Sequence, residues 1–120
     1  MVRATQRKPT ANAALESGPA GLNPAVARCC AAWQSAYQAE TAREPRKENQ
    51  PWANYCGHKA YRNAMPPLCG SENIRDFIAC IAHGILIGSI RGADGARLLY
   101  AAQVAATADR SQPAQPKATA

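Results

Sequence analysis

The sequence predicts a small all-α protein, a three- to four-helix bundle built around a central apolar helix at about residues 73–91. Alanine, the best helix former, is its commonest residue. The stretch 77–90, FIACIAHGILIGSI, carries no charge and lies between Asp76 and Arg91. A segment that is apolar on nearly every face has to be covered by neighbouring elements. At 120 residues, the chain has room for one such domain.

The first helix is predicted over residues 24–43. Asn23 can cap it, and Pro24 occupies its first position, where the missing N–H has no cost. An apolar stripe then recurs at helical spacing through Val26, Cys30, Trp33 and Tyr37, flanked by Cys29 and Ala36. Because Pro45 disfavours helical geometry at the residue before it, we expect the helix to end near Arg43.

A second, shorter helix is predicted from Pro51 to about Ala64, after a polar linker over residues 44–50. Gly57 inside this stretch weakens the helical pattern. The two prolines of Met65-Pro66-Pro67 end it, because a helix does not continue through them.

The third helix is the apolar one, starting at Ser71 or Asn73, and Gly92 is expected to stop it after Arg91. Gly84 and Gly88 share one face, where they would let another helix approach closely. That neighbour is predicted to be a fourth helix, which Asp94 caps. Its buried side is predicted to contain Leu98, Leu99, Ala102, Ala105 and Ala106.

The two ends, 1–22 and 109–120, read as disordered tails around a helical domain over 23–108. They hold five basic and two acidic residues, and so half of the net charge of +6, which weakens the case for a designed basic face. The N-terminus lacks the apolar segment of a secretory signal, and five cysteines suit a reducing compartment. The apolar stretch is too short to span a bilayer. We therefore expect a cytoplasmic protein with no membrane span.

Metal binding is one hypothesis for the cysteines and histidines. Cys80 and His83 are three apart on a helix, so they share a face, and a zinc site accepts such ligands. The weak candidate ligands are Cys56, His58, Cys69, Cys80 and His83. No paired C-x2-C knuckle is present, and buried cysteine packs as a small hydrophobe. The pattern favours structural packing, and we expect no metal or other cofactor.

An enzyme would need a nucleophile, a base and an orienting group. Cys56 with His58 is the only local candidate pair, and the adjacent thiols of Cys29 and Cys30 point in different directions on a helix. No phosphate-cradling glycine loop is present, so we expect a protein that is not an enzyme and has no catalytic residue.

Nucleic-acid binding is the alternative, because aromatic planes can stack on bases while cations neutralise phosphates. The candidate residues are Arg46, Lys47, Trp52, Tyr55, Lys59 and Arg62. The simpler interpretation, which we favour, is that Trp52 and one tyrosine anchor their helix to the bundle while Lys59 and Arg62 stay hydrated. A helix-turn-helix formed by the third and fourth helices is less favoured, since its recognition helix offers only Arg97, Tyr100 and Gln103.

The leading hypothesis is therefore a small non-catalytic helical interaction module that binds a protein partner or a second copy of itself. The small, alanine-rich bundle has more apolar surface on its third and fourth helices than it can cover alone.

Overall fold

The computed structural model describes residues 21–111, and this part of the chain is all-α, as predicted, with four α-helices and no strand. The helices are α2 (Pro24–Arg43), α3 (Gln50–Asn63), α4 (Ser71–Leu86) and α5 (Gly92–Ser111), and a 3-10 turn, η3 (Lys47–Asn49), precedes α3. The expected tails, 1–22 and 109–120, lie almost entirely outside the described residues, although α5 continues to Ser111.

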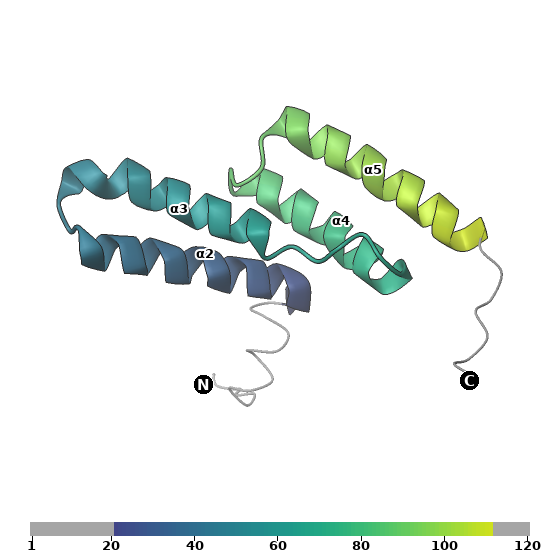
Figure 1. The fold of residues 1–120 in the computed structure, drawn as a ribbon, viewed down its shortest axis with the longest axis horizontal. Coiled ribbons are helices and arrows are strands. Elements are labelled where there is room, and N and C mark those ends of the chain that lie inside the picture. Colours follow the sequence, from purple (N-terminus) through teal and green to yellow (C-terminus); the bar gives the residue numbers. More distant parts are fainter. Residues whose placement is uncertain (1–20, 112–120) are drawn as a thin grey trace, which may run out of the picture.

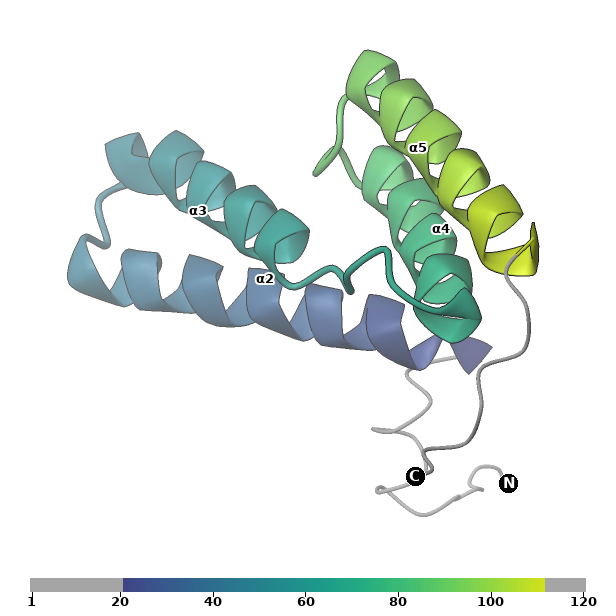
Figure 2. The same cartoon turned by 45° about the vertical axis from the view of Figure 1, so that its right-hand side comes forward.

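The four helices form two antiparallel hairpins, α2 with α3 and α4 with α5 (Figure 1). The segment 64–70 joins them, and α4 packs against α2 as well as α5. Turning the molecule shows that the two hairpins diverge, so that α3 and α5 lie apart (Figure 2). The apolar helix α4 is therefore the element that connects the two hairpins, which agrees with its predicted central place.

The core lies where α2, α3 and α4 meet. Tyr61 of α3 and Ile81 of α4 are fully buried, together with Cys29 and Cys80. The hydroxyl of Tyr61 donates to the carbonyl oxygen of Cys80 over 2.7 Å, so the one polar group of this large side chain is satisfied.

The start of α2 is tied to α4 through one side chain. Asn23 Oδ1 accepts the backbone N–H groups of Ala25 and Val26, as a capping residue should. Its Nδ2 donates to Asp76 Oδ1 of α4 over 3.0 Å. Asn23 therefore caps one helix and fixes that helix against the other hairpin.

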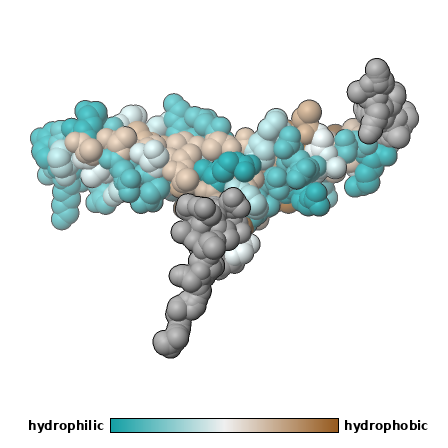
Figure 3. All heavy atoms as spheres, turned by 90° about the horizontal axis from the view of Figure 1, so that it is seen from below, coloured by the Kyte–Doolittle hydropathy of each residue, from teal (hydrophilic) through white to brown (hydrophobic). Residues whose placement is uncertain are grey.

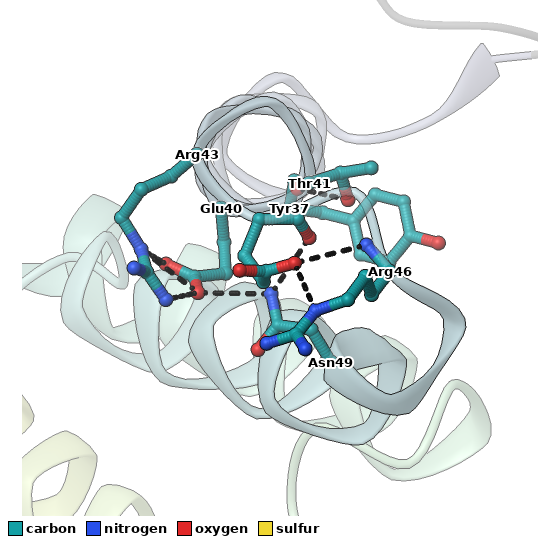
Figure 4. A network of polar contacts seen from close by, with 7 residues as sticks. Tyr37, Glu40, Thr41, Arg43, Arg46 and Asn49 are labelled. Carbon is teal, nitrogen blue, oxygen red and sulfur yellow. Dashed lines mark hydrogen bonds and ion pairs between the residues drawn. The ribbon is translucent and has the colours of Figure 1, made fainter.

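The closed end of the first hairpin is held by a polar network (Figure 4). Glu40 accepts from the Arg43 guanidinium and from Asn49 Nδ2, and Glu44 accepts from Arg46. The hydrogen bonds from Arg46 hold the pKa of Glu44 below its ordinary value. Asn49 also donates to the backbone oxygen of Glu44, so this side chain connects the start of α3 to the end of α2.

Helix α4 ends at Leu86, five residues before the predicted end. Gly88 takes the left-handed backbone conformation, with φ of 82°, and the N–H groups of Ser89 and Ile90 turn back to the Gly84 carbonyl. The prediction that Gly92 stops this helix is wrong, because Gly88 performs that role and Gly92 is the first residue of α5.

The predicted role of Gly84 is also wrong. A Cβ there would lie 2.7 Å from Ile90 Cδ1 and 3.0 Å from Tyr61 Cε1, so this glycine makes room for those side chains. The close approach between α4 and α5 depends instead on Gly95 of α5, where a Cβ would meet Ile85 Cδ1 at 2.5 Å.

The predicted buried side of the last helix faces inward, with Ala102 fully buried and the other four residues half-buried. Asp94 is not the cap. It lies in the first turn and forms ion pairs with Arg91 at 3.4 Å and Arg97 at 3.6 Å. Across residues 21–111, none of the helices combines the length and apolar composition that a bilayer-spanning segment needs.

Candidate interaction surfaces

A row of aromatic and basic side chains runs along the outer face of α3. Spacings of three, four and three residues place its members on one side of the helix. We call it the α3 stripe, and it consists of Trp52, Tyr55, Lys59 and Arg62. From the first to the last member, the row extends about 15 Å, at ~1.5 Å per helical residue.

Trp52 does not anchor α3 to the bundle, contrary to the favoured prediction, although one tyrosine of this helix, Tyr61, does. Its side chain is 52% exposed and stacks on Tyr55, which is 46% exposed, with ring centroids 5.0 Å apart and an interplanar angle of 22°. The residues that do fix α3 are Ala53, Gly57 and Tyr61, all buried on its opposite side. The stacked pair is therefore free to contact another molecule.

The cations of the predicted nucleic-acid site differ in their surroundings. Lys47 and Lys59 are exposed. Arg46 Nε lies 2.7 Å from Glu44 Oε2, which offsets its charge. Arg62 is exposed, but one of its amino groups donates to the Ser89 carbonyl over 2.7 Å and so holds the turn after α4. Two lysines thus supply the cationic charge that has no structural role.

A polar cluster lies between α2, α3 and the turn after α4. Trp33 Nε1 donates to His58 Nδ1 over 3.0 Å, and Ser89 Oγ lies 2.7 Å from the same nitrogen. Because the indole N–H can only donate, Nδ1 is the acceptor and the imidazole proton resides on Nε2. Burial, with a smaller contribution from the Arg62 charge, lowers the pKa of His58, which agrees with a neutral ring.

Gly57 allows this cluster to form. A Cβ at Gly57 would lie 2.6 Å from Trp33 Cε2, so the indole of Trp33 rests directly on the α3 backbone. The same indole also stacks with Tyr37, with ring centroids 5.0 Å apart. The glycine that weakened the sequence pattern of this helix is therefore the residue that lets α2 and α3 pack closely.

The proposed metal ligands do not converge. Among residues 21–111, no group of three or more histidine, cysteine or acidic side chains could hold a metal ion. Cys80 is fully buried against Cys29, Cys69 is exposed in the segment between the hairpins, and His83 stacks with Tyr61. His58 uses its Nδ1 for Trp33 and Ser89, and its described hydrogen bonds include none with Cys56.

A second exposed surface is apolar and belongs to the second hairpin. Of the seven exposed large hydrophobic side chains among the described residues, the two outside it are Trp52 and Tyr55. The other five are Ile78, Leu86, Ile87, Tyr100 and Val104. On the face seen from below, strongly hydrophobic residues show only as small areas among hydrophilic ones (Figure 3). The five residues come from α4, from the turn after it and from α5.

The arrangement of α4 and α5 does not suit a helix-turn-helix. The two helices lie side by side along their lengths (Figure 1), whereas the motif needs a steep crossing. Of its candidate reading residues, Arg97 is 3.6 Å from Asp94 and forms an ion pair with it.

Sequence reasoning did not find the cluster of Trp33, His58 and Ser89, because its members come from three distant segments. It also did not single out Tyr100 and Val104 as a pair, although their spacing of four on a helix is a detectable signal. No protein-family model matches the chain, and neither a curated protein nor a solved structure does.

Proposed function

We propose that this protein is a non-catalytic helical interaction module that associates with a second copy of itself through the outer face of α5. The observation that carries the proposal is the exposure of Tyr100, at 70%, and Val104, at 51%, one turn apart on a helix whose opposite side is buried. We call this face the α5 stripe, and it consists of Ala93, Arg97, Tyr100, Val104 and Ala108.

The composition of α5 supports the proposal. Residues 98–108, LLYAAQVAATA, carry no charge. A helix with apolar or small residues on opposite sides is expected to be covered on both of them. Here α4 covers one side, where Gly95 and Ala102 are buried, and the α5 stripe on the other side is left open.

A second copy of the chain is a suitable partner for this stripe. The alanines near its two ends allow close approach of another helix. Between them, the large side chain of Tyr100 lies next to the smaller side chain of Val104. A two-fold axis between Tyr100 and Val104 would bring the apolar centre of the stripe onto itself and leave Asp94 and Arg110 near the hydrated ends, while Arg97, one turn before Tyr100, forms an ion pair with Asp94.

Analytical ultracentrifugation over a range of concentrations tests the proposal. The expected mass rises from the 12.7 kDa of one chain towards twice that value, and Tyr100→Lys with Val104→Lys abolishes the rise. The matched control is Gln38→Lys on the exposed side of α2, which should leave association unchanged. A monomeric mass at high micromolar concentration contradicts the proposal. Loss of association in Leu86→Lys but not in Val104→Lys would move the interface to α4.

We propose reducing surroundings, such as the cytoplasm, as the working compartment. The support is the odd number of cysteines, all five of them free thiols.

A second candidate function is binding to single-stranded nucleic acid through the α3 stripe. The observation that favours it is the exposed stack of Trp52 on Tyr55, continued along the same helix face by Lys59. Bases can stack on the aromatic pair, and Lys47 with Lys59 can neutralise phosphates without disturbing the fold. The basic N-terminal residues that would assist lie outside the described residues.

Titration of a labelled oligothymidine at increasing salt tests this second function. If two to three cations contact phosphates, the logarithm of the binding constant should fall with that of salt with a slope of about −1.4 to −2.1, at ~0.7 per phosphate. Trp52→Ala and the pair Lys47→Glu, Lys59→Glu should each weaken binding. The control is Arg28→Glu with Arg75→Glu, which changes the net charge equally on other exposed positions. Equal binding by the two charge-reversed proteins excludes the site.

A further inference from the structure

Two thiols face each other across the junction of the hairpins. Cys29 of α2 and Cys80 of α4 are 51 residues apart in the chain, and their sulfur atoms lie 3.7 Å apart. Both side chains have no exposed surface. They lie beside the hydrogen bond from Tyr61 to the Cys80 carbonyl, at the point where the two hairpins are held together.

We propose that Cys29 and Cys80 are a redox-active pair that a hydroperoxide oxidises to a disulfide between α2 and α4. The sulfur atoms have to approach by roughly 1.7 Å to reach the S–S bond length of about 2 Å. No other partner is needed, because each thiol already has the other as its neighbour.

The chemistry balances with hydrogen peroxide as the oxidant. The thiolate of Cys29 attacks one peroxide oxygen, the O–O bond breaks, and hydroxide leaves and takes a proton, giving a sulfenic acid and water. The sulfur of Cys80 then attacks the sulfenic sulfur. Its proton goes to the departing hydroxide, the S–S bond forms, and a second water leaves. Two thiols are oxidised and one peroxide is reduced.

Cys29 is the thiol suited to attack first. The hydrogen bond with Cys80 lowers the pKa of Cys29 against the opposing effect of burial, and raises that of Cys80. Because Cys29 has no exposed surface, peroxide has to reach it through a local opening of the junction between α2 and α4. Cys30, the next residue, lines a surface groove of about 260 Å³ together with Trp33 and His58, which places solvent one residue away from Cys29.

The disulfide would restrict the movement of the two hairpins relative to each other. The hairpins diverge beyond the junction of α2 and α4, so a covalent bond at that junction limits how far they can separate (Figure 2). Closing a loop of this length also restricts the unfolded chain, which raises the temperature of unfolding.

Peroxide treatment of the full-length protein, followed by alkylation under denaturing conditions and peptide mapping, tests the proposal. The expected result is a fall in free thiols from the five of the untreated chain to three, with one linked peptide pair containing Cys29 and Cys80. The melting temperature should rise, and dithiothreitol should reverse both changes. Five remaining thiols, a link that involves Cys30 instead, or an oxygen adduct on Cys29 without a link each overturns the proposal.

A cysteine-depleted variant sharpens the experiment. Cys30→Ser, Cys56→Ser and Cys69→Ser leave only the proposed pair, and a mass loss of about 2 Da on oxidation then reports the S–S bond directly. Adding Cys80→Ser is the control, and it should abolish the mass loss and the rise in melting temperature. If the depleted variant does not fold, the peptide map of the natural sequence decides alone.

Discussion

The indole N–H of Trp33 donates to His58 Nδ1 over 3.0 Å, and this bond determines which nitrogen of the imidazole carries the proton. Protonation of Nδ1 would remove the acceptor from a half-buried indole. Burial and, to a smaller extent, the charge of Arg62 lower the pKa of His58, and this also favours the neutral ring.

The first prediction concerns pH. Since the folded state lowers the pKa of His58 below its unfolded value of about 6.5, the stabilisation is complete above that pH and is lost as the pH falls towards the folded pKa. We expect the urea midpoint to fall between pH 7 and pH 5. His58→Gln keeps an acceptor but cannot titrate, so its midpoint should fall less. If the urea midpoints of the two proteins fell equally with pH, His58 would be excluded as the cause.

The second prediction concerns the glycine under the indole. Gly57→Ala places a Cβ 2.6 Å from Trp33 Cε2, and the resulting strain of about 1–3 kcal/mol exceeds the gain in helix propensity of at most ~1 kcal/mol. Chemical denaturation should therefore show a net loss of up to about 2 kcal/mol. The control is Asn54→Ala, an exposed change on the same helix, which should be neutral or slightly stabilising. A stable Gly57→Ala protein would mean that the indole can move away without cost.

The third prediction compares the effect of alanine at two glycines near the turn after α4. Gly88→Ala forces a left-handed conformation on a residue with a Cβ, which costs about 1–2 kcal/mol. Gly92→Ala meets no atom within 4 Å, so it should leave the free energy of unfolding almost unchanged. Thermal unfolding of the two variants side by side checks the difference. Equal melting temperatures would contradict the assignment of Gly88 as the end of the helix.

The fourth prediction concerns Asn23. Asn23→Asp keeps an oxygen for the cap but brings a carboxylate to within about hydrogen-bond distance of Asp76, and we expect a loss of about 1–3 kcal/mol. Asn23→Ser also keeps the cap and loses only the hydrogen bond to Asp76, so its loss should be about 0.5–1.5 kcal/mol. Urea denaturation measures both values. An aspartate variant as stable as the serine variant would show that the contact with Asp76 is not formed.

Local signals predicted α2 well. Asn23 and Pro24 set the start of this helix, and Pro45 sets its end. Their effects come from backbone chemistry that does not depend on the rest of the fold. The end of α4 could not be predicted in this way. Both Gly88 and Gly92 can stop a helix, and burial of Ile90 against Gly84 selects the earlier one. That packing joins residues from separate turns, which a pattern along the chain does not report.

The candidate surfaces were partly predictable. The spacing of Trp52, Tyr55 and Lys59 showed that they share one side of a helix, but not whether that side faces the core. The structure resolves this because Gly57 and Tyr61 take the inward side of α3. The sulfur pair of Cys29 and Cys80 depends on the crossing of α2 and α4, and helical spacing carries no information about such a crossing.

The hairpin architecture also bears on how the protein is made. Most of the packing of α3 is with the helix immediately before it, so the unit of α2 and α3 contains its own partner surfaces once residue 63 has been synthesised. Helices that pack against sequence neighbours assemble quickly, since only short loops have to close. The first hairpin can therefore assemble before α4 docks on it, and Cys29 becomes buried only when α4 packs against α2.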